Sequence, residues 1–165
     1  MSARCKPANA LPVAVAAVIG QPGILLIRRR NPPFVGHWGL PGGKIQTGEH
    51  LDQAVRREVL EETGVRARFE CLCGVVTEFL YEGPRLAMHY LLLVCRLSPL
   101  TGQLRSSSEG TVRWFPLSRV RDVANEVIPS DRLMLERLVF CRPRNRYFRC
   151  VVRKTKDEYR VVSFR

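Results

Sequence analysis

The feature that most constrains this chain is residues 43–65, where a glycine-rich loop leads into a segment that is partly apolar and partly acidic. Helical spacing places Glu58, Glu61 and Glu62 on one face of a helix predicted over about residues 49–63. The same face is apolar one to two turns earlier, at Leu51, Ala54 and Val55. A solvated acidic face normally lies opposite the apolar stripe, so this arrangement predicts carboxylates at the edge of a core.

Carboxylates gathered at such an edge repel one another and lose hydration unless a positive charge lies among them. A hard divalent cation, Mg²⁺ or Mn²⁺, is the simplest such charge, because it prefers oxygen ligands and shares its shell with substrate phosphates. Arg57 can hold one glutamate through a bidentate ion pair. Gly64 should end the helix, because glycine accepts the left-handed conformation there. The residues Pro41-Gly42-Gly43 allow close backbone approach, and the Gly43 carbonyl is a candidate further ligand.

Length and composition indicate one globular domain. The chain has 165 residues, enough for a core that needs no disulfide or metal in order to fold. Its 45 % hydrophobic and 25 % charged residues exclude disordered, collagen-like and coiled-coil chains. The 27 Lys and Arg against 15 Asp and Glu give a net charge of +12, which favours anionic partners such as phosphates or nucleic acid. Residues 137–165 contain ten basic and two acidic residues, so the end of the chain is the most basic part.

The cysteines and the N-terminal segment bear on the compartment. No two of the six cysteines have the spacing of a C-x-x-C metal site, and we expect all six to be reduced thiols. No apolar stretch reaches the ~18 residues of a membrane-spanning helix. Pro12 interrupts the apolar run of residues 10–19, which we interpret as a strand and not as a signal peptide. These features favour a cytoplasmic enzyme without a membrane partner.

Apolar segments separated by turn residues, with one or two helices, predict an α+β (mixed α/β) fold. The predicted strands span residues 12–19, 23–29, 66–80, 86–97, 112–115, 147–153 and 159–164. Residues 31–48 are predicted to form a loop rich in proline and glycine. A second helix should begin near Leu117 or after Pro129-Ser130, and the last two strands should form a terminal hairpin.

Residues 43–65 resemble the Nudix box at every defined position of the pattern G-x5-E-x7-R-E-V-x-E-E-x-G-V. The resemblance covers about residues 10–140 and implies the Nudix fold, a mixed β-sheet sandwiched between helices, with the box as a loop–helix–loop. Residues 1–140 would then be a Nudix hydrolase domain, and residues 141–165 a basic C-terminal extension. We expect the extension to be a hairpin that packs on the same domain or on a partner subunit.

The resemblance also implies Mg²⁺-dependent hydrolysis, with Mn²⁺ as a substitute, of a nucleoside diphosphate linked to another moiety. The residues implied for the metal site are Glu58, Glu61, Glu62, Gly43 and Glu49. Arg57 is implied as a supporting residue, and the expected catalytic residues are Glu61, Arg57 and Glu109. Glu109 is the first candidate for the carboxylate that accepts the proton of the attacking water, and Glu78 is the second.

Segments around the box resemble the bacterial ADP-ribose pyrophosphatase-like branch of this family, which favours ADP-ribose or a similar nucleotide sugar as substrate. These segments are residues 25–34, 38–43, 88–90 and 109–116. In that branch an arginine of the second strand reaches the phosphates, and Arg29 has this position, with Arg28 on the opposite face. The candidate substrate-binding residues are Arg29, Trp38, Glu78 and His89. Four alternatives stay open: Trp38 as a core residue, His89 as a histidine held within an apolar strand, Arg29 as a solvated arginine at the strand end, and Glu109 as a solvated loop acid.

Other substrate classes also stay open. ADP-ribose-specific members commonly have a proline sixteen residues beyond the box, and diadenosine polyphosphate hydrolases a tyrosine. Here Tyr81 lies sixteen residues beyond Val65, and the nearest proline is Pro84. Lys44-Ile45 resembles the MutT-type triphosphatases, which remove oxidised nucleotides from the pool. A MutT-type pyrophosphohydrolase and a diadenosine polyphosphate hydrolase are therefore alternatives.

The basic extension has two interpretations. Arginines and lysines interleave with Tyr147, Phe148, Tyr159 and Phe164, which is typical of a surface that stacks bases and binds phosphates of single-stranded nucleic acid. The valine pairs of the same segment favour a hairpin packed on the core or on a second copy in a homodimer. The non-enzyme alternative is a Nudix-like module that binds a nucleotide or nucleic acid. The intact glutamates of the box favour the enzyme.

Overall fold

The computed structural model describes residues 9–120, 123, 125–141, 146–156 and 158–165. Its elements are β1 (Leu11–Gly20), β2 (Gly23–Arg29), β3 (Trp38–Gly39), β4 (Gly42–Lys44), α1 (Leu51–Thr63), β5 (Arg66–Glu82), β6 (Arg85–Thr101), β7 (Gly110–Phe115), the 3-10 turn η1 (Leu117–Arg119), α2 (Pro129–Met134), the π-helical turn η2 (Leu135–Val139), β8 (Arg146–Thr155) and β9 (Glu158–Phe164).

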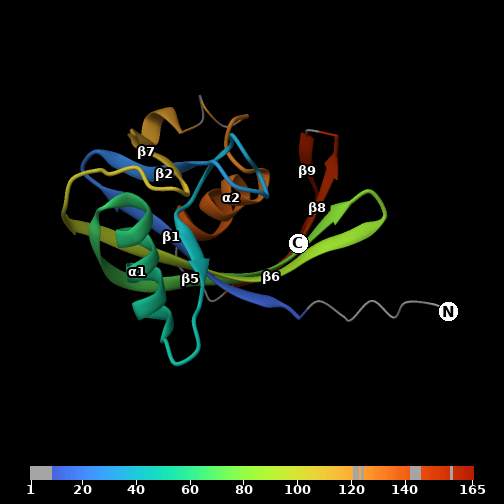
Figure 1. Cartoon of the computed structure of the whole chain (residues 1–165), viewed down its shortest axis with the longest axis horizontal. Coiled ribbons are helices and arrows are strands. Elements are labelled where there is room, and N and C mark those ends of the chain that lie inside the picture. The colour runs from blue at the N-terminus through green and yellow to red at the C-terminus, as the bar shows by residue number, and fades with distance from the viewer. Residues whose placement is uncertain (1–8, 121–122, 124, 142–145, 157) are drawn as a thin grey trace.

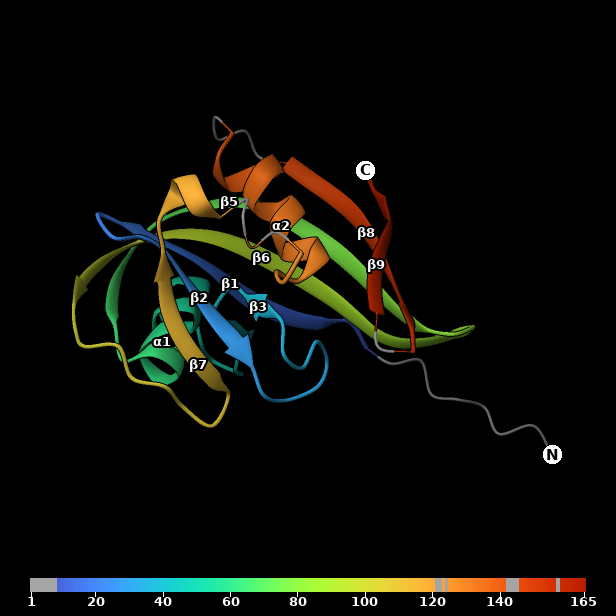
Figure 2. The same ribbon diagram turned by 90° about the horizontal axis from the view of Figure 1, so that it is seen from above.

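The strands form one mixed sheet in the order β3-β2-β1-β6-β5-β8-β9, with β4 added to β1 and β7 to β2. The β1–β6 and β5–β8 pairs are parallel, and the other neighbours are antiparallel. Figures 1 and 2 show the sheet as a curled surface, with β5 and β6 running through most of its length and β8 and β9 at one end.

Each face of the sheet packs on one helix. Successive residues of β1 alternate between two separate cores, with Val15 and Ala17 in one and Ala14, Ala16 and Val18 in the other. The first core contains the buried side chains of α2 and η2, and the second contains those of α1. The predicted sandwich of a mixed sheet between helices is therefore confirmed.

Helix α1 begins and ends where its terminal residues can pair their backbone groups. At the N-terminus, the His50 N–H donates to the Gln53 side chain at 2.9 Å. At the C-terminus, Gly64 adopts a left-handed conformation (φ 76°) and its N–H donates to the Leu60 carbonyl at 3.0 Å. The apolar face buries Ala54, Val55 and Val59 against β1, so the acidic last turns are fixed at the edge of this core.

The structure differs from the sequence expectations in the loop of residues 31–48 and in the longest strands. The loop contains two short strands, β3 and β4, which are too short to produce a periodic pattern. Strands β5 and β6 are 17 residues each, longer than predicted, because they pair as a long hairpin beyond the core. The second helix, α2, begins at Pro129, the second of the two predicted starts.

The terminal hairpin is present, and it extends the sheet. Strand β8 lies beside β5 along a parallel ladder from Gly74↔Arg146 to Glu82↔Lys154. It also places Cys150 and Val152 in the core beside α2. All five cysteines of the described residues are free thiols, whereas Cys5 lies outside those residues. No helix within the described part of the chain is long and apolar enough to cross a membrane.

Candidate active site

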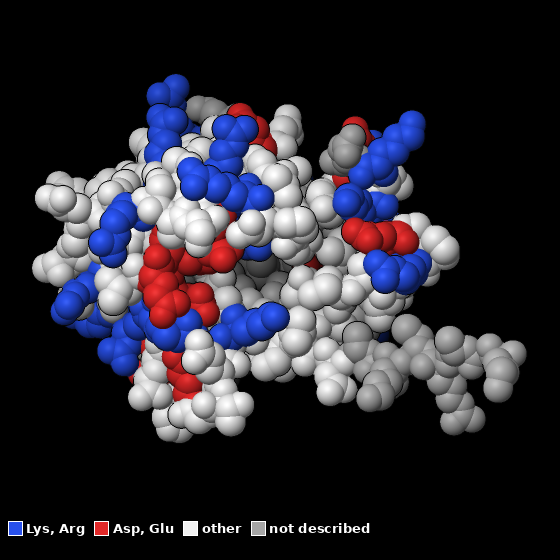
Figure 3. Space-filling view, in the orientation of Figure 1, with Lys and Arg blue, Asp and Glu red and all other residues white. Residues whose placement is uncertain are grey.

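The acidic face of α1 meets the loop that precedes it. The Glu62 side chain lies under this loop at only 7 % exposure, and one of its oxygens accepts the Gly42 N–H at 2.9 Å. Burial raises the pKa of Glu62 to about 7, and the charges of Glu58 and Glu109 also raise it. Figure 3 shows acidic side chains gathered in one patch on this face, beside a hollow in the surface. The fold thus holds several carboxylates close together, where each raises the electrostatic cost of ionising the others.

Arg57 lies at the centre of this cluster. Its guanidinium pairs with Glu49 (Nε–Oε1, 2.7 Å), with Glu58 (Nη1–Oε1, 2.7 Å) and with Glu61 (Nη1–Oε2, 3.2 Å). A further N–H donates to the carbonyl of Lys44 at 3.2 Å. The hydrogen bonds from Arg57 lower the pKa of Glu49, whereas burial raises the pKa of Glu58 despite the same partner. The arginine therefore orients three carboxylates and ties them to the loop.

Gly43 lies against the Glu58 carboxylate. A Cβ atom at position 43 would lie 2.5 Å from the Glu58 carboxylate atoms, so a side chain there would force this carboxylate to move. Glycine at this point lets the backbone and the carboxylate approach closely without displacing the carboxylate. The loop backbone and the acidic face of α1 are thus in direct contact, and the carboxylates of that face form a surface of oxygen atoms.

This surface fits a hard divalent cation by the chemistry of its donors. In the part of the chain that the structure describes, no three acidic, histidine or cysteine side chains already converge at metal-binding distances. The oxygens are nevertheless the type that Mg²⁺ and Mn²⁺ prefer. The buried Glu62 also lies near further negative charges that a cation would offset. The expected metal residues Glu58, Glu62 and Gly43 lie together, and Glu61 lies more exposed at the rim.

A cavity of about 290 Å³ lies beside the sheet, and Gly42, Gly43 and Lys44 of β4 form part of its wall. Its polar lining consists of Arg29, Lys44, Glu78, Tyr90, Ser130 and Asp131. Its apolar lining includes Phe34, Met88 and Met134. Since Gly42 and Gly43 contact Glu62 and Glu58, the cavity lies next to the carboxylate cluster. Such a cavity can hold the part of a ligand that lies beyond the reacting group.

Arg29 lies between the cluster and the inner cavity. Its charge lowers the pKa of both Glu62 and Asp131, which places the guanidinium within electrostatic reach of each. Its Nε donates to the Pro33 carbonyl at 3.0 Å, and this bond orients the side chain. Arg28 is exposed and donates to the Gly36 carbonyl instead. The alternation along β2 thus places Arg29 at the cavity and Arg28 on the opposite face of the strand.

Glu78 and Glu109 approach the site from different sides. Glu78, on β5, is 2 % exposed and lines the inner cavity. Burial raises its pKa, and hydrogen bonds from Ser130 and Cys150 oppose that rise. Glu109 lies in the exposed loop before β7, where Asn31 donates to its Oε2 at 3.1 Å. Since the charge of Glu109 raises the pKa of Glu62, this loop acid lies within electrostatic reach of the cluster.

Two predicted substrate residues, Trp38 and His89, do not line the cavity. The Trp38 side chain is 8 % exposed and packs edge-on against Phe115, with ring centroids 4.9 Å apart. Its alternative interpretation, a core residue, describes the structure. His89 precedes Tyr90 on β6, so it points to the opposite face, where its ring lies 4.5 Å from that of Phe79. We therefore leave both residues out of the site.

Asp131 is a site residue that the sequence analysis missed. One of its oxygens accepts the Leu40 N–H at 2.7 Å, so it joins α2 to the loop before the box. Burial raises the pKa of Asp131 to about 7, and the charge of Glu78 adds to this rise. The only local signal was an acidic residue in the first turn after Pro129, which predicts a helix start and not a buried site.

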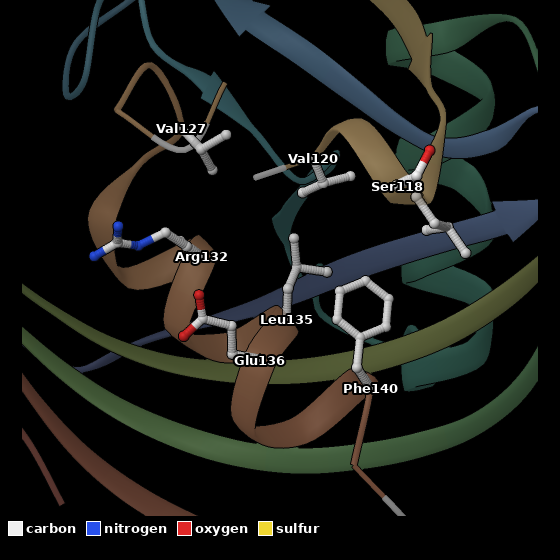
Figure 4. A pocket seen from close by; sticks show the side chains of 8 residues that line it. Ser118, Val120, Val127, Arg132, Leu135, Glu136 and Phe140 are labelled. Carbon is white, nitrogen blue, oxygen red and sulfur yellow. The ribbon is translucent and has the colours of Figure 1, made fainter. Parts of the chain in front are cut away.

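A second cavity, of about 650 Å³, lies away from this site (Figure 4). Arg132, Leu135 and Glu136 project into it from α2 and η2, and Val120, Val127 and Phe140 complete much of its lining. It shares no lining residue with the cavity beside the carboxylate cluster. It therefore has no direct part in the chemistry of the cluster.

Comparison with known proteins agrees with this geometry. The family described as NUDIX domain matches residues 10–138. An ADP-ribose pyrophosphatase of Methanocaldococcus jannaschii is 34 % identical over 116 residues, which are 68 % of this chain and 66 % of the relative. An oxidized purine nucleoside triphosphate hydrolase of Danio rerio is 31 % identical over 105 residues, 62 % of this chain and 65 % of the relative. The chain thus matches just under two thirds of the length of these two proteins.

A solved structure described as a MutT protein of Bacillus halodurans superposes with a TM-score of 0.74. It covers 94 % of this chain and 96 % of its own, at 22 % identity. At that identity the likeness concerns the fold. The matched fold, the filled box and the cluster on α1 all lead to the same family.

Proposed function

The chain belongs to the Nudix hydrolase family, and on this premise we propose that it hydrolyses the pyrophosphate bond of a nucleoside diphosphate derivative with the help of Mg²⁺. The favoured substrate is ADP-ribose or a similar nucleotide sugar, and one product is a nucleoside monophosphate. The observation that supports this most is that the carboxylate face of α1 contacts Gly42 and Gly43, and these glycines line a cavity that also contains Arg29. Pyrophosphate chemistry needs both a place for cations and a positive side chain for the phosphates.

The metal would be held by Glu58, Glu61 and Glu62, with the Gly43 carbonyl and Glu49 as further oxygens of the site. When bound, it supplies charge neutralisation for the pyrophosphate and a better nucleophile at neutral pH. Arg57 keeps the carboxylates in place through its ion pairs, and for this reason we regard it as a positioning residue.

The remaining residues bind the substrate or accept a proton during the reaction. Arg29 holds a phosphate of the substrate, because its guanidinium lies between the carboxylate cluster and the inner cavity. A carboxylate oxygen of Glu109 accepts the proton of the attacking water, since this exposed loop acid lies near Glu62 without being part of α1. The inner cavity holds the part of the substrate beyond the phosphates and excludes water from it.

The substrate class has one serious competitor. A relative named for ADP-ribose hydrolysis supports the favoured substrate. A relative of similar identity named for oxidized purine nucleoside triphosphates supports MutT-type hydrolysis of triphosphates instead. Diadenosine polyphosphates are the third class, predicted from Tyr81. A module that only binds nucleotides is disfavoured, because every glutamate of the box is present in the cluster.

Product analysis tests this proposal. The purified protein is incubated with ADP-ribose, a diadenosine polyphosphate, dGTP and its oxidised form, each with Mg²⁺ and with EDTA, and the products are separated by anion-exchange chromatography. AMP and ribose 5-phosphate, formed fastest from ADP-ribose and absent with EDTA, are expected. Nucleoside monophosphate plus pyrophosphate as the fastest reaction would move the protein to the MutT type. Turnover of none of these compounds by wild-type protein that is folded by circular dichroism would refute the proposed substrates.

Three further expectations belong to the same proposal. Location in the cytoplasm is supported by the five free thiols, which a reducing compartment keeps reduced. A homodimer remains a prediction, testable by light scattering. Contact of the basic extension with nucleic acid also remains a prediction, for which salt-sensitive RNA binding is the measurement.

A further inference from the structure

The hairpin of β8 and β9 lies outside residues 10–138, the part of the chain that matches the family, yet it contacts the substrate cavity at two points. The first contact is made by Tyr159 of β9. Its ring lies 4.3 Å from the Phe34 ring, between centroids, and its hydroxyl oxygen accepts the Phe34 backbone N–H at 3.2 Å. Phe34 lines the cavity, so the hairpin touches the cavity wall from behind.

Phe34 depends on such an outside contact. Its φ of 67° is in the left-handed region, which is unfavourable for a residue with a side chain and persists only where the surroundings hold it. It lies in a loop, residues 31–37, whose ends are fixed by backbone bonds between Arg29 and both Gly36 and His37. Tyr159 also lies edge-on to the His37 ring, at 5.7 Å. The tip of the loop is therefore clamped by a residue that is distant in sequence.

The second contact is at the inner end of the cavity. The parallel ladder places Cys150 of β8 directly opposite Glu78 of β5. The Cys150 thiol and the Ser130 hydroxyl hydrogen bond to the Glu78 carboxyl, whose Oε2 has no hydrogen-bond partner among the described residues. A buried polar atom without a partner is costly, and here it lines the cavity that a ligand would enter. The hairpin thus helps to orient the polar group at that end.

We propose that the C-terminal hairpin is a substrate-binding element of this enzyme, in which Tyr159 acts as a positioning residue that holds Phe34 and the loop of residues 31–37 in the shape that binds substrate. This inference rests on the proposed function. It assigns to the hairpin a role in substrate affinity and not in the chemical step, because both contacts lie at the cavity and neither touches the carboxylate cluster on α1.

The test compares two tyrosines of the same hairpin. Tyr159→Phe keeps the ring but removes the hydroxyl that accepts the Phe34 N–H, and Tyr159→Ala removes both contacts. Tyr147→Phe is the matched control, since Tyr147 is exposed on β8 and its hydroxyl pairs with Thr77 outside the cavity. The readouts are KM and kcat for the best substrate, the Kd of AMP by calorimetry, and hydrogen exchange at the amides of residues 34–37.

For Tyr159→Phe we expect KM and Kd to rise at least about fivefold, as for a buried N–H left without its partner, with kcat changed less than about twofold. Exchange at the Phe34 amide should become faster, and Tyr159→Ala should show larger effects of the same kind. Tyr147→Phe should match the wild type. Equal KM, Kd and exchange in Tyr159→Phe and the wild type would overturn the inference, as would a loss of kcat at unchanged KM. If the wild type turns over no nucleotide, the proposed function fails. The AMP affinity and the hydrogen exchange still test whether Tyr159 holds Phe34 and its loop in place.

Discussion

Replacement of Asp131 by asparagine should change how the stability of the protein depends on pH. The native carboxyl is buried between α2 and the loop before the box, and its pKa is raised to about 7 from an ordinary value of 3.8. Asparagine has the same shape, and its side-chain oxygen can still accept the Leu40 N–H. The variant therefore removes the ionisable group while it keeps the contact that joins α2 to the loop.

The sign of the effect follows from proton binding. Between pH 5 and pH 7 the native Asp131 is largely protonated, whereas the unfolded chain has lost this proton. Unfolding thus releases a proton, and the free energy of unfolding falls as pH rises, until both states are ionised above pH 7. At about 1.4 kcal/mol for each pH unit, this group should lower the free energy of unfolding of the wild type by about 3 kcal/mol between pH 5 and pH 8. An asparagine side chain does not titrate and has no such loss, so the variant should gain stability relative to the wild type as pH rises.

Urea unfolding at pH 5, 6, 7 and 8, followed by the fluorescence of Trp38 and Trp114, measures this difference. Asp52→Asn makes the same chemical change at an exposed residue of α1 and controls for the loss of one negative charge. If the stabilities of wild type and Asp131→Asn differ by a constant amount from pH 5 to pH 8, Asp131 is ionised throughout. The argument from burial would then be wrong.

Three further substitutions test the carboxylate cluster. Glu62→Gln should lower kcat by about 10²-fold or more with the fold intact, because it removes a charged metal ligand, whereas Glu70→Gln on β5 should keep turnover; steady-state kinetics and circular dichroism decide. Gly43→Ala should lower kcat/KM at least ~10-fold, because the added Cβ would lie 2.5 Å from the present position of the Glu58 carboxylate atoms and would displace them. Steady-state kinetics and a thermal melt measure the two effects. Arg57→Lys should cost ~1–2 kcal/mol of unfolding free energy, since lysine cannot pair with both oxygens of Glu49; an undiminished stability in urea would contradict the bidentate pairing.

The fold was largely predictable where a periodic pattern or a turn residue marks it. The helix of the box ends at Gly64 as predicted, because a left-handed C-terminal residue is a local requirement of the chain. Most strands lie where apolar runs predict them. The short strands β3 and β4 were not predictable, since two or three residues pair only because the surrounding sheet presents an edge.

The site was predictable only in part, for a similar reason. Helical spacing was enough to group the glutamates of α1 on one face. Asp131 was missed because its role depends on where α2 meets a loop some ninety residues earlier in the chain. Trp38 was a candidate for stacking, but the indole packs against Phe115, a contact between distant segments. Local sequence patterns thus could not identify residues whose roles depend on contacts between distant segments.

The parallel pairing of β8 with β5 also bears on self-association. Without the hairpin, the outer half of a 17-residue strand would expose a row of unpaired N–H and C=O groups, the kind of edge that recruits strands from other molecules. With the hairpin in place, β9 becomes the outermost strand, and it is short and has charged residues at Glu158 and Arg160. Charged, short edges oppose further strand addition. A preparation clipped near residue 140 by a protease should therefore aggregate, and an intact C-terminus would be a requirement for handling this protein at high concentration.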